Sequence, residues 1–230
     1  MLALCPPSVI IKAGCERVTA SFVPSVFVVI GLSEEGVNWE LILASGSPRR
    51  RELLASTGLS FQIESPAVEE LSGDDLPPRE LALANARLKC MAVSLARPKA
   101  VVIGADTVVA LGGKVYGKPE SLEEAAGNLR EFRGRVHEVI TGVVVACGDR
   151  VVEFVECSYV KFRSFSDEVI AEYLEKVPVL DKAGGYAIQH HGEMIVERYE
   201  GDFDNIVGLP VSLVLDQLER MGFPVPQKES

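Results

Sequence analysis

Apolar residues recur along the chain with two periods, one typical of strands and one typical of helices. Valine-rich runs predict a buried strand at Val101 to Ala110 and a β-hairpin formed by Val136 to Ala146 and Val151 to Phe162. Helical spacing predicts a helix from Arg79 to Leu95, and a capping sequence at Ser121 to Glu124 predicts the start of another. The mixture of strands and helices indicates an α/β fold.

The segment Ser45 to Leu54 predicts a sharp turn from a short strand into a helix. Ser47 is a good N-cap and Pro48 suits the first helical position. The small residues before Pro48 allow a ligand close to the backbone, where free N–H groups point at it. Arg49 and Arg50 are poorly placed for the helix dipole, which favours anions at this end. Both a phosphate-binding turn and an ordinary capped helix with solvated arginines fit this stretch.

Polar residues interrupt the predicted elements at several other points. Asp106 and Thr107 break the valine-rich strand, and a buried carboxylate there must bind a cation, carry a proton or cap a turn. The loop Asp181 to Gln189 combines an acid, a base, two glycines and an amide, a composition typical of functional loops. The scattered acids and lysines suit metal-assisted attack on a phosphate chain. They are Glu70, Asp106 and Asp181 with Lys89, Lys118 and Lys182.

The three histidines are weak candidates for catalysis or metal binding. A single histidine in an apolar strand, such as His137, is more often a hydrogen-bonded structural residue. His190 and His191 are adjacent, and adjacent residues of a strand face opposite sides. A shared metal site at this pair is therefore not expected.

Composition and charge narrow the function classes. A chain of 230 residues, 47% of them hydrophobic, can bury the core of one large α/β domain or two small lobes. A formal net charge of −10 argues against a nucleic acid polymer as partner. Five scattered cysteines without a C-x-x-C pair indicate neither a disulfide framework nor a zinc site, so the cytoplasm is the expected location.

The first 36 residues differ from the rest of the chain. The uncharged run Val18 to Ser33 is too short to span a bilayer, so no membrane is expected as partner. A targeting segment, a packed arm and a loose extension of uncertain status remain open alternatives for residues 1–36. The main domain is expected to occupy residues 37–230.

Six motifs occur in a fixed order between Ser45 and Pro210. They are S-G-S-P-R-R-x-E-L-L at 45–54, G-A-D-T at 104–107, G-K-P at 117–119, H-x-x-x-T-G at 137–142, D-K-A-G-x-Y-x-I-Q at 181–189 and N-x-V-G-L-P at 205–210. The stretch that they mark extends from Leu41 to about Met221, and six motifs in this order make a chance match very improbable. The sequence resembles the Maf family of nucleotide pyrophosphatases.

The resemblance implies a fold and a reaction. It implies a two-lobed mixed sheet with flanking helices, related to the inosine-triphosphate pyrophosphatases, with the active site between the lobes. Members of the family hydrolyse nucleoside triphosphates between the α- and β-phosphates, which gives the monophosphate and pyrophosphate. They use a divalent metal cation, Mg²⁺ or Mn²⁺, and a homodimer is their usual state.

The resemblance also implies roles for individual residues. Asp106 matches the proton acceptor that activates water, and Asp106 and Glu70 match positions near the metal. Arg49, Thr107 and Gln189 resemble the branch that acts on dTTP and UTP, whereas the 7-methyl-GTP branch has an aromatic residue in place of Arg49. The phosphate-contacting positions are Ser45, Arg50, Lys89 and Lys118. Asp181 and Lys182 are further candidates for the site.

Two alternatives accompany this interpretation. The family is also associated with arrest of septum formation, so the chain could be a nucleotide-binding regulator of cell division with little turnover. Modified pyrimidine triphosphates could replace the canonical ones as substrates. The N-terminal extension and the pair His190 and His191 depart from the family pattern.

Overall fold

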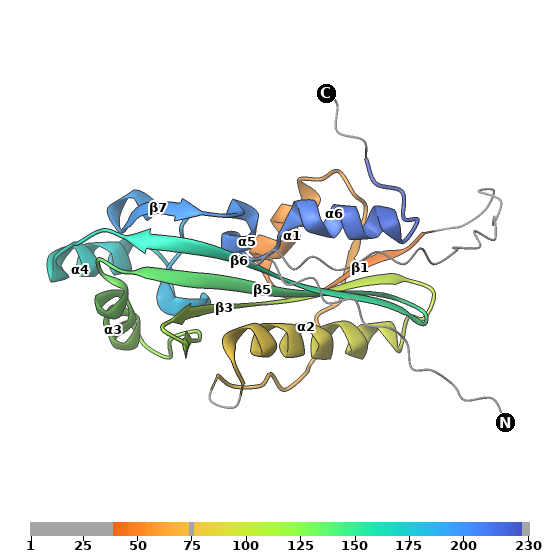
Figure 1. Cartoon of the computed structure of the whole chain (residues 1–230), viewed down its shortest axis with the longest axis horizontal. Helices are drawn as coiled ribbons and strands as arrows, with labels where there is room; N and C mark the ends of the chain where they lie inside the picture. Colours follow the sequence, from red (N-terminus) through yellow and green to blue (C-terminus); the bar gives the residue numbers. More distant parts are fainter. Residues whose placement is uncertain (1–38, 74–75, 227–230) are drawn as a thin grey trace, which may run out of the picture.

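The computed structural model describes residues 39–73 and 76–226 as one mixed sheet with helices on both faces (Figure 1). The predicted N-terminal extension, residues 1–36, lies outside the described residues. The strands are β1 (Leu41–Ala44), β2 (Gln62–Ile63), β3 (Val101–Leu111), β4 (Lys114–Tyr116), β5 (Val136–Cys147), β6 (Arg150–Phe162) and β7 (Val196–Glu200). The helices are α1 (Pro48–Ala55), α2 (Pro78–Ser94), α3 (Leu122–Phe132), α4 (Asp167–Lys176), α5 (Phe203–Val207) and α6 (Val211–Arg220), with short 3₁₀ turns η1 (Ala183–Gly185) and η2 (Gly192–Met194).

The seven strands form one sheet in the order β2-β1-β3-β5-β6-β7, with β4 paired to β3. β1 is parallel to β2 and β3, whereas β3, β5, β6 and β7 pair antiparallel. The hairpin of β5 and β6 and the helix α2 lie where the sequence predicts them. Ser121 is the N-cap of α3, as predicted, because its side chain accepts from the amide of Glu124, while the carboxylate of Glu124 accepts from the amide of Glu120 rather than from that of Ser121.

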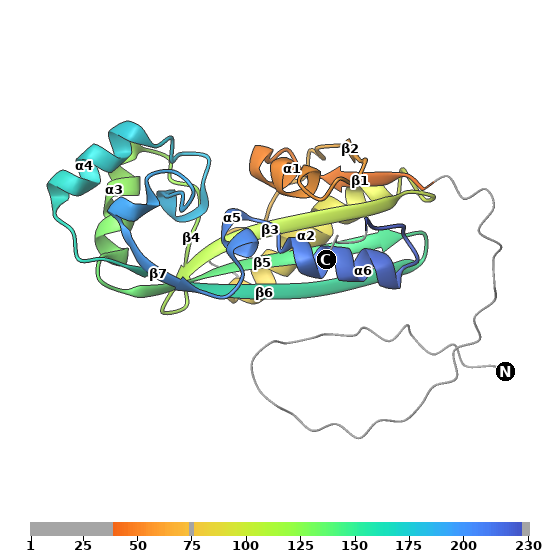
Figure 2. The same cartoon turned by 90° about the horizontal axis from the view of Figure 1, so that it is seen from above.

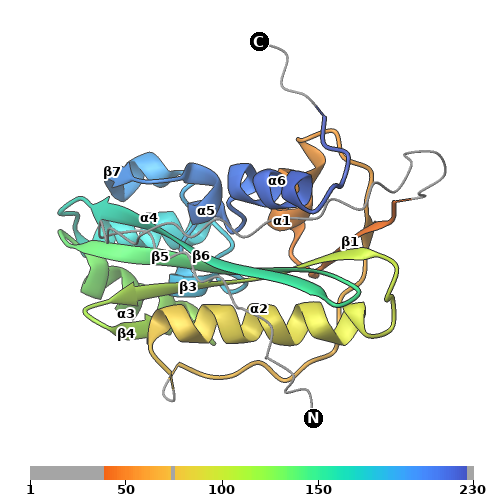
Figure 3. The ribbon, with the colours of Figure 1, turned by 45° about the vertical axis from the view of Figure 1, so that its right-hand side comes forward.

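Alternation along the strands sends neighbouring residues to opposite faces of the sheet. On one face, apolar residues of β1, β3 and β5 pack with α6 and with Leu54 of α1. On the other face, the intervening residues pack with Ala86, Cys90 and Val93 of α2. Figure 3 shows α2 along one face and α1 with α6 on the opposite one.

Two glycines bring α2 unusually close to the sheet. A Cβ at Gly104 of β3 would lie 2.5 Å from the carbonyl oxygen of Ala86, and a Cβ at Gly142 of β5 would lie 2.5 Å from the backbone of Ala82. Real Cβ atoms do not approach that closely, so only glycine permits this packing. The close contact at Gly104 therefore fixes the position of α2 at a point of β3 that lies two residues before Asp106.

The sheet is divided into two lobes by the lengths of its strands. β1 pairs with β3 only as far as Gly104, and β4 pairs with β3 only from Val109 onward. Between these two residues, this edge of β3 pairs with neither β1 nor β4. The long strands β3, β5 and β6 run through both lobes, with α1, α2 and α6 in one and α3 and α4 in the other (Figure 2). The predicted two-lobed mixed sheet is confirmed.

His137 lies in the aromatic core of the second lobe. Its side chain is 1% exposed, its Nε2 is 2.8 Å from the hydroxyl of Tyr186, and its ring stacks on Phe132 with centroids 4.6 Å apart. Burial lowers the pKa of His137 to about 3, so the ring is neutral at physiological pH. The prediction of a structural histidine is confirmed.

The prediction for His190 and His191 rested on a wrong secondary structure. Both residues are exposed in a turn before η2 rather than in a strand, and His191 adopts a left-handed backbone conformation with φ 52°.

No helix in the described ranges is long and apolar enough to cross a membrane.

Candidate active site

A cleft of about 340 Å³ opens beside the part of β3 that pairs with neither β1 nor β4. All eleven residues that the sequence predicts for the site line this cleft. Among them are five cationic side chains and three carboxylates, although the whole chain carries a net charge of −10. A local excess of positive charge in an acidic protein indicates an anionic ligand.

Asp106 lies on the face of β3 that contacts α2. Its side chain is largely buried, and its two oxygens are both engaged from that helix. The Nζ of Lys89 is 2.6 Å from Oδ1, and Nδ2 of Asn85 is 3.5 Å from Oδ2. The carboxylate is therefore held in one orientation at the floor of the cleft.

Glu70 reaches the same lysine from the acidic loop before α2. Its Oε1 is 3.0 Å from Nζ of Lys89, so Glu70 and Asp106 converge on one amine. Asn85 holds this loop, because it accepts from the amide of Leu71 at 2.8 Å and donates to the carbonyl of Leu71 at 3.2 Å.

Asn85 is the site residue that sequence reasoning missed. It is 4% exposed and lies one helical turn before Lys89, on the same face of α2. A buried amide four residues from a candidate lysine is the signal that could have identified it, since buried amides need partners.

The start of α1 forms a turn with free amide groups. Ser47 occupies the N-cap position and Pro48 the first helical position, as predicted, but the side chain of Ser47 makes no capping bond. Instead, Oγ of Ser45 accepts from the amide of Ser47 at 3.2 Å. The amides of Arg49 and Arg50 make no hydrogen bond with any described residue, which leaves them available for an anion.

Arg50 is buried rather than solvated. Its guanidinium donates to the carbonyl of Gly208 at 2.8 Å, to Oγ1 of Thr107 at 2.9 Å and to Oγ of Ser45 at 3.3 Å. Burial lowers the pKa of Arg50, and the charge of Asp106 opposes that effect. Arg50 therefore joins α1, β3 and the turn before α6 while its charge contributes to the cleft.

Thr107 faces the opposite side of β3 from Asp106. Its hydroxyl lies 2.9 Å from that of Thr141 and 3.3 Å from the carbonyl of Gly208. These contacts and the one from Arg50 fix the rotamer of Thr107 at the cleft wall.

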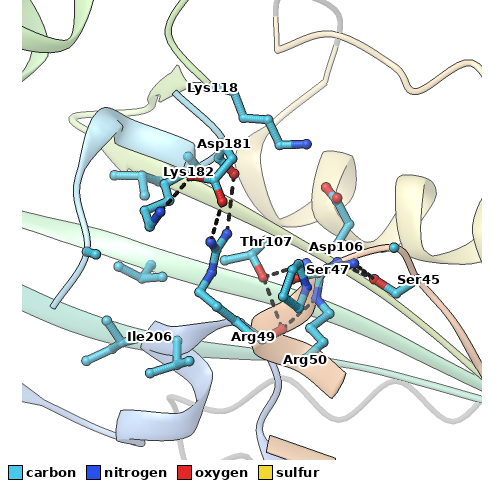
Figure 4. Close-up of a pocket in the computed structure, with 18 of the residues that line it drawn as sticks. Ser45, Ser47, Arg49, Arg50, Asp106, Thr107, Lys118, Asp181, Lys182 and Ile206 are labelled. Carbon is cyan, nitrogen blue, oxygen red and sulfur yellow. Dashed lines mark hydrogen bonds and ion pairs between the residues drawn. The ribbon is translucent and has the colours of Figure 1, made fainter. Parts of the chain in front are cut away.

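Arg49 spans the cleft from α1 to the loop before η1 (Figure 4). Its Nη1 is 2.8 Å from Oδ2 of Asp181 and its Nη2 is 3.3 Å from the carbonyl oxygen of the same residue. Lys182 contacts the other carboxylate oxygen of Asp181 at 2.6 Å. Burial raises the pKa of Asp181, but the hydrogen bonds from Lys182 and Arg49 outweigh it, so the pKa lies below its ordinary value.

Lys118 and Gln189 are two of the exposed members of the site. Figure 4 shows the side chain of Lys118 extending over the cleft from the loop after β4. Both side chains line the cleft, and within the described part of the chain neither makes a hydrogen bond to another side chain or to the backbone. Both are therefore free to contact a ligand.

The described residues contain no group of three or more histidine, cysteine, aspartate or glutamate side chains that could hold a metal ion. Glu70 and Asp106 are two carboxylates that converge on one point. Mg²⁺ in phosphate-transfer sites is commonly held by one or two carboxylates together with the substrate's phosphates. The two carboxylates fit such an ion, which would compete with Lys89 for them.

Comparisons with known proteins agree with this geometry. The family model described as Maf-like protein matches residues 40–221. A protein of Akkermansia muciniphila named dTTP/UTP pyrophosphatase is 46% identical over 183 residues, which cover 80% of this chain and 97% of that protein. Proteins with the same name from Pyrococcus furiosus and Dictyoglomus thermophilum are 41% and 43% identical, over 78% and 80% of this chain and 94% and 97% of theirs.

Among solved structures, the Ham1 protein of Staphylococcus aureus aligns with 79% of this chain and 99% of its own, at 18% identity and a TM-score of 0.44. The family model spans most of the chain, and the curated relatives exceed 40% identity over nearly their whole length. The chain belongs to the Maf family.

Proposed function

We propose that this chain is a nucleoside triphosphate pyrophosphatase that hydrolyses dTTP and UTP to the nucleoside monophosphate and pyrophosphate. The observation that carries the proposal is the carboxylate of Asp106, held by Lys89 at 2.6 Å in a cleft rich in cations. The names of the relatives from Akkermansia and Pyrococcus support the same reaction.

The cations of the cleft suit a triphosphate. Lys118 has no partner among the described residues, and the amides at the start of α1 are free. Together with Arg50 and Lys89, they would neutralise charge on the phosphate oxygens. A leaving pyrophosphate needs this neutralisation because it departs with additional negative charge.

Asp106 is the group that can accept a proton from the attacking water. It is fixed through both oxygens, and a positioned carboxylate reaches its proton without reorganisation. A protein that only binds nucleotides has no use for a base in this position. The arrangement favours turnover over a purely regulatory role in septum formation.

Arg49, Thr107 and Gln189 would select the base. The amide of Gln189 can donate to a carbonyl and accept from the imino N–H of uracil or thymine. Cytosine lacks that imino hydrogen, and a guanidinium such as Arg49 donates only, so both residues favour uracil and thymine. The same groups would accept modified uracils whose carbonyls are intact.

A divalent cation, Mg²⁺ or Mn²⁺, is part of the proposal. Glu70 and Asp106 would hold it, as their oxygen donors suit a hard ion. The ion would supply Lewis-acid polarisation of the phosphates. A cytoplasmic location and a homodimeric state remain predictions from the sequence.

Product analysis tests the proposal. Purified protein would be incubated with dTTP, UTP, CTP, GTP or 7-methyl-GTP and either cation, and the products followed by ³¹P NMR. We expect equal amounts of monophosphate and pyrophosphate from dTTP and UTP, and at least tenfold slower turnover of the others.

Two results would contradict the proposal. Release of orthophosphate and a nucleoside diphosphate would show that a different bond is cleaved. Tight nucleotide binding without any turnover would favour the regulatory alternative.

A further inference from the structure

Three side chains form a continuous chain of contacts across the mouth of the cleft. Lys182 contacts Oδ1 of Asp181 at 2.6 Å, and Asp181 contacts Nη1 of Arg49 through Oδ2 at 2.8 Å. Figure 4 shows Arg49 pointing from α1 toward Asp181 on the opposite wall. The reaction described above uses Arg49 but assigns nothing to Asp181 or Lys182.

Lys182 anchors this chain of contacts in the protein. Its side chain is 8% exposed, and its amine also donates to the carbonyl of Pro178. A buried ammonium group needs an anionic partner, which Asp181 provides. The carboxylate of Asp181 is therefore held in place from behind, although its own side chain is 56% exposed.

Asp181 in turn fixes the guanidinium of Arg49. Its carboxylate and its backbone carbonyl accept from Nη1 and Nη2, so the planar group is held at both ends. An ion pair this exposed adds little to folding stability. Its main consequence is the orientation of Arg49.

We propose that Asp181 and Lys182 are positioning residues that preset the guanidinium of Arg49 for uracil and thymine. Once Arg49 is fixed, its remaining N–H groups have defined directions toward the cleft. They attract a base carbonyl and repel the amino group that cytosine carries instead. This inference rests on the proposed function, because it concerns the selectivity of the same site.

A double-mutant cycle between Asp181→Asn and Arg49→Lys tests the inference. Asparagine keeps the shape of aspartate but loses its charge. We expect Asp181→Asn to raise KM for UTP about tenfold, to change kcat less than threefold and to lower the UTP-to-CTP ratio of kcat/KM at least tenfold. Because Asp181 acts through Arg49, the kcat/KM of the double variant for UTP should be no lower than that of Arg49→Lys alone.

Asp167→Asn provides a matched control. Asp167 also pairs with two cations, Arg130 and Arg133, and its side chain is 53% exposed, but it does not line the cleft. The same chemical change there should leave KM and selectivity unaltered. If Asp167→Asn changed selectivity as much as Asp181→Asn does, a general loss of charge would explain both.

Binding without turnover separates this inference from the proposed reaction. Calorimetric titration in the presence of EDTA measures the dissociation constants of UTP and CTP. Wild type, the two single variants and the double variant then give the same double-mutant cycle in affinity. Additive losses in affinity, or unchanged discrimination in Asp181→Asn, would overturn the positioning role even if wild type turns over UTP. Coupled losses in affinity without turnover would support the positioning role and contradict the proposed reaction.

Discussion

Asp106 and Thr107 are neighbours in the chain but belong to different networks. Asp106 faces α2 and contacts Lys89, whereas Thr107 faces α1 and contacts Arg50. Alternation along β3 sends them to opposite faces, and the uncovered edge of β3 lets both reach the cleft. Two consecutive residues therefore contribute side chains to opposite walls of the site.

Replacing Asn85 with leucine should loosen the acidic loop. The substitution leaves the amide and the carbonyl of Leu71 without their buried partner, at a cost of about 1–3 kcal/mol. We expect faster hydrogen exchange at the Leu71 amide and at least a tenfold lower kcat/KM for dTTP. Glu153→Gln, which weakens an exposed contact of Arg87 on the same helix, is the control and should leave that exchange rate unchanged.

His137 should make folding stability depend on pH. Its pKa is about 3 in the folded protein, against about 6.5 in the unfolded chain, so below pH 6.5 the unfolded chain binds more protons. Stability is therefore lost as the pH falls from about 6.5 toward 3. Between pH 7 and pH 5 we expect wild type to lose about 2 kcal/mol more than His137→Gln, measured by urea unfolding. Equal losses in the two proteins would contradict a neutral buried histidine.

At the scale of elements, the position of α2 determines the geometry of the carboxylate of Asp106. The helix carries both Lys89 and Asn85, and glycines at 104 and 142 let it approach β3 and β5. The G-A-D-T motif therefore combines a packing residue, Gly104, with the proposed base, Asp106. Any side chain at Gly104 would displace the helix that holds Asp106.

Gly104→Ala should destabilise the protein by about 1–3 kcal/mol, because the new methyl group would meet Ala86 and Cys90 at less than 3 Å. Movement of Lys89 should also lower kcat. The control is Gly127→Ala in α3, where a Cβ meets nothing within 4 Å and alanine should stabilise the helix by up to about 1 kcal/mol. Thermal denaturation should show a lower melting temperature than wild type for Gly104→Ala and a higher one for Gly127→Ala. Equal melting temperatures of the two variants would contradict this account.

At the scale of the whole molecule, local signals in the sequence predicted the elements well. Turn glycines and the N-cap Ser121 fix element ends within a few residues, so the hairpin, α2 and α3 could be predicted. The burial of Arg50 could not, because its partners Thr107 and Gly208 come from distant segments. The contact between Arg49 and Asp181, 132 residues apart, depends likewise on how the two lobes face each other.

The candidate site was predictable mainly through its motifs. Residue patterns alone gave acids and lysines at strand ends, and the resemblance to a family assigned their roles. The convergence of Glu70 and Asp106 on Lys89 required the acidic loop to fold back onto α2, which Asn85 holds in place. The strand expected at His190 and His191 was wrong, because a turn precedes η2 there.

Asp106 is proposed to act as the base on a nucleoside triphosphate bound in the cleft. The most direct measurement compares pyrophosphate release from dTTP by wild type and Asp106→Asn, with dTTP affinity measured in parallel in EDTA. We expect kcat to fall by about 10²–10⁴-fold while the affinity changes only a few-fold, since the cations that bind the phosphates remain. A variant that keeps kcat within a few-fold of wild type would contradict the assignment of Asp106 as the base.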